Sequence, residues 1–121
     1  ISEYCSLVHS SGGFIIQAHP FREASYIETI LLAPWHVDGV EVLNTHNSNE
    51  ENMRAAKYAK SYNLCGSAGS DIHRVTQQEL AGVALKKRAS DIGELTGEIK
   101  SGEARIFRKT LPSPVLSARP V

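Results

Sequence analysis

Short apolar segments of strand type alternate with helix-like segments along the chain, and this alternation limits the folds that the chain can adopt. Three such segments are expected to form buried strands: residues 14–18, 39–43 and 64–70. Between the second and the third, Ser48 and Glu51 form a capping box, which predicts a helix that continues to about residue 62. Strands that alternate with helices are typical of a parallel sheet, so the sequence predicts the α/β class.

Further elements are expected on either side of these strands. Apolar residues at helical spacing predict a helix at the start of the chain, ended by Gly12 and Gly13. The other expected elements are a short helix over residues 26–32, a strand or extended segment over residues 80–85, a helix from Asp91 to Gly102, and a last strand over residues 104–107.

The helix that begins at Ser48 is expected to pack on the sheet through one narrow face. Met53, Ala56, Ala59 and Tyr62 recur at helical spacing along that face. The small side chains among them would allow a close approach to the sheet. A basic triplet at residues 86–88 is interpreted as a solvated loop.

Composition limits the class of the protein and its partners. With 121 residues the chain is long enough for one small domain. Thirteen basic and thirteen acidic residues cancel, so a nucleic-acid partner is not expected, although a local basic patch remains open. No apolar run approaches the roughly 20 residues of a membrane span, and nothing at the start resembles a signal peptide. Cys5 and Cys65 fit no metal or redox spacing and are expected to be reduced thiols in a cytoplasmic protein.

Polar side chains follow each of the three expected strands. His19 follows the first, His46 follows the second, and Asp71 with His73 follows the third. Residues i and i+2 of an extended chain project to the same side, so Asp71 and His73 can bind one ion together. Parallel strands end at one edge of a sheet, so the four residues are expected to meet there. A hard oxygen beside imidazole nitrogens suits zinc, manganese or iron, and the sequence therefore predicts a metal site.

The remaining polar residues have other interpretations. A lone histidine is more often a hydrogen-bond partner than a ligand, so His9, within a helix, and His36, in a loop, are not expected in the site. Glu41 lies inside a strand and is expected to support the ligands as a structural carboxylate. The alternative for the whole set is an unrelated α/β chain with a fortuitous histidine cluster, and it predicts that the histidines lie far apart.

Three ordered motifs also resemble a known family. They are GFIIQAHPFR at residues 13–22, DGVEVLN at residues 38–44 and GSDIH at residues 69–73. In this order they resemble the C-terminal portion of a PHP (polymerase and histidinol phosphatase) domain, as found in PHP-type metal-dependent phosphoesterases. The resemblance covers residues 1–107, and residues 108–121, with three prolines, are expected to be an extended C-terminal tail.

The resemblance implies a fold and a site. The fold is a distorted (β/α)7 TIM-like barrel, of which this chain would form the C-terminal half. His19, His46, Asp71 and His73 match metal ligands of the family, which binds two or three divalent ions (Zn, Mn or Fe) in the complete protein. The resemblance implies that Arg22 contacts the substrate phosphate. The alternative role for Arg22 is a salt bridge on the surface.

The chain departs from the family pattern in one respect. It contains no His-x-His, and the further histidine and bridging glutamate of the family's N-terminal half have no counterpart. The chain alone is therefore expected to be inactive. A half barrel would also expose sheet edges, so self-association with a second copy is expected.

The function that the resemblance implies is hydrolysis of a small phosphorylated metabolite by a metal-dependent phosphoesterase, with the activity residing in the complete parent protein. The alternative is a non-catalytic or exonuclease-type PHP module associated with DNA metabolism. Every ligand expected in this half of the family is present, which favours an active parent. The sequence does not identify the phosphoester.

Overall fold

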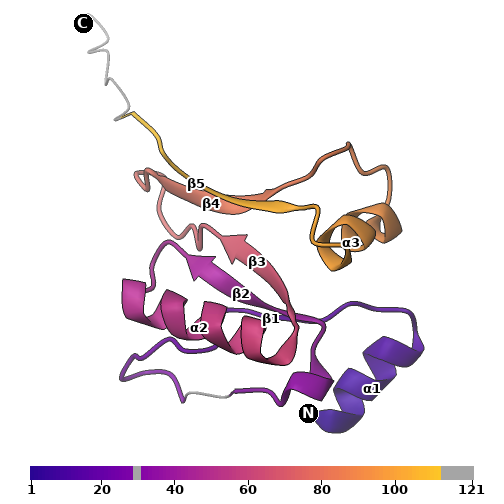
Figure 1. The fold of residues 1–121 in the computed structure, drawn as a ribbon. Coiled ribbons are helices and arrows are strands. Elements are labelled where there is room, and N and C mark those ends of the chain that lie inside the picture. Colours follow the sequence, from indigo (N-terminus) through magenta and orange to yellow (C-terminus); the bar gives the residue numbers. More distant parts are fainter. Residues whose placement is uncertain (29–30, 113–121) are drawn as a thin grey trace, which may run out of the picture.

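A parallel sheet of three strands forms the centre of the computed structural model, which describes residues 1–28 and 31–112 (Figure 1). The described residues form, in chain order, α1 (Ser2–Ser10), β1 (Ile16–Gln17), the 3-10 helix η1 (Pro34–His36), β2 (Gly39–Asn44), α2 (Asn49–Tyr62), β3 (Cys65–Gly69), β4 (Glu79–Ala84), α3 (Ile92–Lys100) and β5 (Arg105–Thr110). The α/β class predicted from the alternation of segments is confirmed.

The three central strands lie in the order β1-β2-β3, and both pairings are parallel. Gly39 is the register partner of Ile16 on one side and of Cys65 on the other. The register shifts between Glu41 and Leu43, so that Val42 has no partner on β3 and forms a β-bulge. A Cβ on Gly39 would lie against the backbone of Cys65, so glycine permits the close approach of these two strands.

Helix α2 begins and ends where the sequence predicts. The Ser48 side chain accepts a hydrogen bond from the Glu51 backbone N–H at 3.2 Å, and the Glu51 carboxylate accepts from the Ser48 N–H at 2.6 Å. This reciprocal pair satisfies two of the donors that a helix start leaves open. Asn63 ends the helix in the left-handed conformation, with φ of 53°.

Of the four residues predicted to pack α2 on the sheet, only Ala59 is buried. The buried residues are Asn52, Ala55 and Ala59, whereas Met53 and Tyr62 are 64% and 54% exposed. The reason is a polar anchor. The Asn52 side chain accepts from the Asn44 N–H at 3.0 Å and donates to the Asn44 carbonyl at 3.1 Å, and this pair turns the helix by one residue from the expected face.

The short helix expected over residues 26–32 does not form in the described part of that segment, which excludes residues 29–30. The backbone N–H and carbonyl of Leu32, which would form hydrogen bonds within a helix, are bound instead by side chains of other segments. The Leu32 N–H donates to the Gln17 side chain at 3.0 Å, and the Leu32 carbonyl accepts from the Tyr58 hydroxyl at 2.8 Å. Leu32 therefore packs against the buried cluster of Val37, Val40 and Ala59 without belonging to a helix.

The fourth and fifth strands form a separate antiparallel ribbon and not a continuation of the parallel sheet. The Ser70 hydroxyl explains this arrangement, because it accepts from the Ala81 N–H and donates to the Ala81 carbonyl, both at 2.8 Å. A side chain thus takes the place of a backbone ladder between β3 and β4. Because β4 and β5 do not continue the parallel sheet, the described residues do not show the expected half of a TIM-like barrel.

The last predicted helix and strand are both observed. The Asp91 carboxylate caps α3 by accepting from the Glu94 N–H at 2.9 Å. Strand β5 continues beyond Phe107 to Thr110, and the described residues stop at residue 112. Most of the expected tail, residues 113–121, lies outside the described residues, and the division of the chain at residue 107 stays a prediction.

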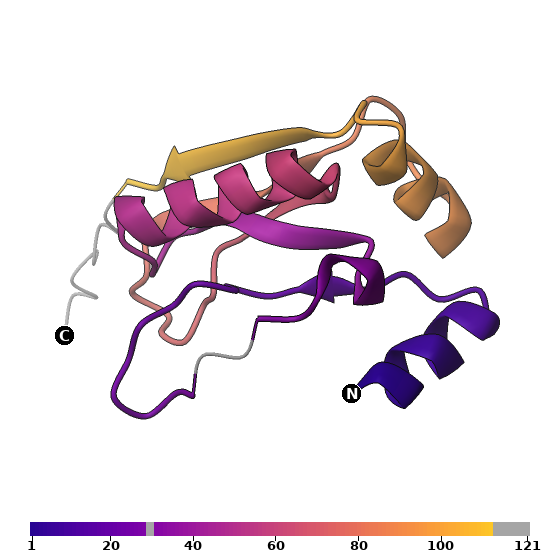
Figure 2. The same cartoon turned by 60° about the horizontal axis from the view of Figure 1, so that its bottom comes forward.

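The arrangement of these elements leaves one end of the sheet open. Helices α1 and α3 lie together at the end from which β2 and β3 start, as both views show (Figures 1 and 2). The arrowheads of β2 and β3 point away from these helices, toward the loops that follow the strands (Figure 1). Among the described residues, no helix combines the length and apolar character that crossing a bilayer requires.

The anchor between Asn52 and Asn44 leads to a testable prediction. Asn52→Ala leaves the buried Asn44 N–H without its acceptor and should lower the free energy of unfolding by about 2 kcal/mol in urea denaturation. Met53→Ala, one residue away on the exposed side of the same helix, should change it by less than about 0.5 kcal/mol. A larger cost for Met53→Ala than for Asn52→Ala would show that the helix packs through the face expected from the sequence.

Candidate metal and phosphate site

The four predicted metal ligands all lie just after the carboxyl ends of β1, β2 and β3. Two of them adopt a positive φ, which residues other than glycine rarely adopt: 29° at His19 and 47° at Asp71. Such conformations cost about 1–3 kcal/mol each and cluster at functional sites. The strained positions coincide with the residues that the sequence singles out.

Asp71 is the electrostatic centre of the site. Its Oδ2 lies 2.5 Å from Nη2 of Arg22, and its Oδ1 lies 2.8 Å from Nε2 of His73. Partial burial by itself raises the pKa of the Asp71 carboxyl, but the hydrogen bond and charge of Arg22, with the hydrogen bonds of His73 and Asn44, outweigh it and lower the pKa to about 2. Asp71 is therefore a carboxylate at every physiological pH.

Arg22, His46, Asp71 and His73 line one pocket of about 250 Å³, together with side chains that include Tyr26 and Glu51. The rings of His46 and His73 lie edge to face, with 6.0 Å between their centroids. The alternative of a fortuitous histidine cluster, spread far apart, is therefore wrong for these two residues. A larger hollow of about 630 Å³ beside residues 85–95 contains none of the predicted site residues.

His19 is connected to this pocket through Glu41 and does not line it. The His19 backbone N–H donates to Oε2 of Glu41 at 2.9 Å, and the same oxygen accepts from Nδ2 of Asn44 at 3.0 Å. Side chains three residues apart on a regular strand point to opposite faces, and the bulge at Val42 brings Glu41 and Asn44 to the same side. Glu41 thus joins the His19 backbone to the Asn44 side chain, and its predicted support of metal ligands stays a prediction.

Gly69 leaves the space that the Glu41 carboxylate occupies. A Cβ at Gly69 would collide with Oε1 of Glu41. The carboxylate is not free to swing aside, because its other oxygen holds the His19 N–H and the Asn44 amide. A glycine at the end of β3 is therefore a requirement of the network beneath the pocket.

Two asparagines, Asn44 and Asn47, hold Arg22 in place, and neither was predicted as a site residue. The Arg22 Nε donates to Oδ1 of Asn47, and Nη2 donates to Oδ1 of Asn44, both at 2.9 Å. The Arg22 side chain is 14% exposed, so it forms a largely buried ion pair with Asp71 and not the surface salt bridge considered as its alternative. The signal in the sequence was the pair of asparagines three residues apart directly after a strand.

The donor set fits part of a metal site. Asp71 stays ionised and His73 offers a neighbouring imidazole nitrogen, and a carboxylate with imidazole is the ligand chemistry of zinc, manganese and iron. Within residues 1–28 and 31–112, no group of three or more histidine, cysteine, aspartate or glutamate side chains is arranged to hold a metal ion. The described residues therefore bring together the carboxylate of Asp71 and the imidazole of His73, and binding of a metal ion by them stays a prediction.

Comparison with known proteins finds a family model that matches part of the chain. Residues 49–103 match the family model described as PHP-associated. The match lies inside the region that resembles a PHP domain and includes Asp71 and His73, and it confirms the resemblance found in the sequence. No solved structure matches the chain.

Three curated relatives share part of the chain. A 5'-3' exoribonuclease of Haemophilus influenzae is 31% identical over 71 residues, which are 54% of this chain and 26% of the relative. The 5'-3' exoribonucleases Rnm of Salmonella typhimurium and Escherichia coli are each 32% identical over 79 residues, which are 61% of this chain and 27% of each relative. The chain thus spans about a quarter of the length of these relatives.

The expectation that nucleic acid is not a partner is wrong. The relatives are named for action on RNA, and that finding outweighs an argument from net charge. Thirteen basic and thirteen acidic residues give a net charge of zero for the chain as a whole. Binding to phosphates depends on local charge, which a sum over the sequence does not measure.

The ion pair of Asp71 yields a prediction about its pKa. Arg22→Met removes the guanidinium, so the pKa of Asp71 should rise from about 2 toward its ordinary value of 3.8, measured by carbon NMR of the carboxyl group. Because the folded-state pKa is lowered, the pair contributes stability above about pH 4 that is lost as the pH falls toward 2. Arg74→Met removes an exposed arginine from the same loop as Asp71, one that forms no ion pair with it among the described residues, and should leave this pKa unchanged. An unchanged pKa of Asp71 in the Arg22→Met variant would show that Arg22 and Asp71 do not form an ion pair.

The fit of Gly69 against Glu41 yields a second prediction. Gly69→Ala should lower the free energy of unfolding by about 2 kcal/mol, because the added methyl group displaces a carboxylate that is held in place. Gly97→Ala is the matched control, since a Cβ there meets nothing within 4 Å and alanine favours the helix by about 1 kcal/mol. Urea denaturation measures both. Equal effects of the two substitutions would contradict the packing described here.

Proposed function

We propose that this chain is the carboxyl-terminal part of a PHP-type, metal-dependent hydrolase that cleaves RNA from its 5' end. The relatives named as 5'-3' exoribonucleases support the substrate class, and the PHP-associated match supports the hydrolase class. The observation that carries the proposal is the single pocket lined by Arg22, His46, Asp71 and His73. It combines metal-binding groups with a cation that suits a phosphate.

In the proposed site, Asp71 and His73 bind a divalent ion, with His46 beside them and His19 as a further ligand. The first two already lie within 2.8 Å of each other and come from one short segment. A bound ion would supply positive charge against the phosphoryl oxygens and lower the pKa of a water. Imidazoles bind a metal only when neutral, so metal affinity should fall as the pH drops.

Arg22 and Asn47 are proposed to contact the phosphate. A metal ion on Asp71 would compete with Arg22 for the carboxylate, and the oxygens of Asn44 and Asn47 would keep the guanidinium beside the pocket. The amide nitrogen of Asn47 is buried and has no hydrogen-bond partner among the described residues. A buried donor without an acceptor is costly, and a phosphate oxygen is an acceptor of the right kind.

The rest of the site is proposed to come from the remainder of the parent protein. Because the chain spans about a quarter of its relatives, a closed barrel and a complete set of two or three ions need strands and ligands from outside residues 1–121. The isolated chain is accordingly expected to be inactive. Its exposed sheet edges remain the basis for expecting association with a second copy.

The proposal is tested on the complete parent protein with a 5'-phosphorylated RNA oligonucleotide, manganese or zinc, and a chelator arm. His19→Ala and Asp71→Ala should each reduce cleavage about a hundredfold or more, because each removes a proposed ligand. His36→Ala, a histidine of η1 outside the pocket, is the matched control and should retain full activity. Full activity of the His19 and Asp71 variants would refute the metal site.

A second arm of the same experiment tests the substrate class. Small phosphomonoesters, the substrates first expected from the family resemblance, are offered to the same enzyme under the same conditions. Slower hydrolysis of these compounds than of RNA is the expected result. Faster hydrolysis of a small phosphomonoester, with RNA left intact, would show that the enzyme is a metabolite phosphatase.

A further inference from the structure

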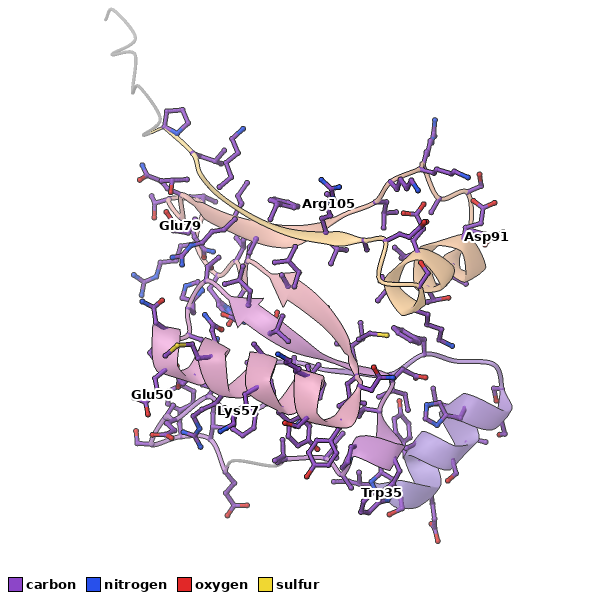
Figure 3. All side chains as sticks on the ribbon, in the orientation of Figure 1. Trp35, Glu50, Lys57, Glu79, Asp91 and Arg105 are labelled. Carbon is purple, nitrogen blue, oxygen red and sulfur yellow. The ribbon has the colours of Figure 1, made fainter. Side chains whose placement is uncertain are left out.

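The residues of β5 alternate between two faces of the β4–β5 ribbon. Register partners share a face, so Arg105, Phe107 and Lys109 lie on one side with Ala84, Gly82 and Leu80 of β4. We call the set of Arg105, Phe107 and Lys109 the basic-aromatic face. Figure 3 shows Arg105 projecting from the side of the ribbon that points away from β3.

The opposite face of the ribbon is turned toward the parallel sheet, and the positive charge on it is neutralised by a carboxylate. Ile106 lies over Gly66 of β3, where its Cδ1 would be 3.6 Å from an added Cβ. Arg108 forms an ion pair with Glu79 at 2.9 Å, and Glu79 also accepts a hydrogen bond from Thr110. The cation on this side therefore has an acidic partner within the ribbon.

The basic-aromatic face has no such compensation. Among the described residues, no carboxylate forms an ion pair with Arg105 or Lys109, although the chain as a whole is neutral. Phe107 lies between them in sequence and is 42% exposed, with its ring over Gly82. Two free cations that flank an exposed ring suit a partner with negative charge and flat apolar groups.

We propose that the basic-aromatic face binds single-stranded RNA, with Phe107 stacking on a base and Arg105 and Lys109 contacting phosphates. This inference rests on the proposed function and extends it to the substrate beyond its 5' end. Alternate residues of a strand place the three side chains along about 13 Å, and stacking with backbone contacts tolerates any base sequence. A face covered by another protein domain would be expected to be apolar, without two uncompensated charges.

The face also lies on a path from the pocket. Lys109 is opposite Leu80, the second residue of β4, and the loop of residues 70–78 joins that strand to Asp71. A second hollow of about 600 Å³ is lined by His46 and His73, which also line the pocket, and by Arg74, Thr76 and Gln77 of this loop. RNA held with its 5' end in the pocket can therefore continue over the loop toward Lys109.

The test compares a long and a short substrate on the complete parent protein. The long one is a 12-nucleotide RNA with a 5' phosphate, and the short one is a 5'-phosphorylated dinucleotide that reaches only the pocket. Phe107→Leu keeps an apolar cover over Gly82 but cannot stack, and it should raise KM for the long RNA about tenfold. The kcat, and all constants for the dinucleotide, should stay unchanged.

The charge on the face is tested through salt dependence. Arg105→Gln and Lys109→Gln should each weaken binding of the long RNA and reduce the slope of log affinity against log salt by about 0.7. Lys57→Ala removes an exposed cation from α2 and is the control, which should change neither quantity. An unchanged KM in Phe107→Leu, or an equal loss on the dinucleotide, would overturn the proposal.

The failure of this proposal can be told apart from failure of the proposed function. If the wild-type parent cleaves neither substrate, fluorescence anisotropy of the long RNA in a chelator still measures binding. Weaker binding by Phe107→Leu than by the wild type and Lys57→Ala would then support the face without the chemistry. Equal binding by all three proteins would refute the face whatever the catalytic result.

Discussion

Both the fold and the candidate site depend on the hydrogen bonds of one buried residue, Asn44 at the end of β2. Its backbone is held by the Asn52 amide, which fixes how α2 lies on the sheet. Its side-chain oxygen accepts from Arg22, and its side-chain nitrogen donates to Glu41 and, at 3.4 Å, to Asp71. Asn44 is 1% exposed, so each of these bonds replaces one that water would otherwise make. The position of the helix and the geometry of the site are therefore set together.

The site is built to hold one strong charge in place. Asp71 is kept ionised by a guanidinium that is itself fixed by two asparagine oxygens, so neither partner can move without breaking several bonds. The positive φ values of His19 and Asp71 are the conformational cost of placing these groups at the edge of the sheet.

The distribution of charge also explains why net charge wrongly predicted that nucleic acid is not a partner. The net charge of the chain is zero, yet within the described residues Glu79 neutralises Arg108 on the inner side of the ribbon, while Arg105 and Lys109 on the outer side form no ion pair. A sum over the sequence cannot separate these two faces, because the separation follows from the pairing of β4 with β5. The relatives that act on RNA agree with a local basic surface of this kind.

The sequence by itself determined the α/β class and the three parallel strands, because these follow from local periodicity. It also determined the caps of α2 and α3, which follow from capping chemistry. The position of His46, Asp71 and His73 after the strands, where they line one pocket, follows from where the strands end. Tertiary structure alone decided the rest. The Asn52 anchor rotated α2, the Ser70 hydroxyl diverted β4 out of the parallel sheet, and the bulge at Val42 brought Glu41 under the site. These outcomes rest on hydrogen bonds between residues distant in sequence or on a shift of strand register, and no local pattern encodes such partners.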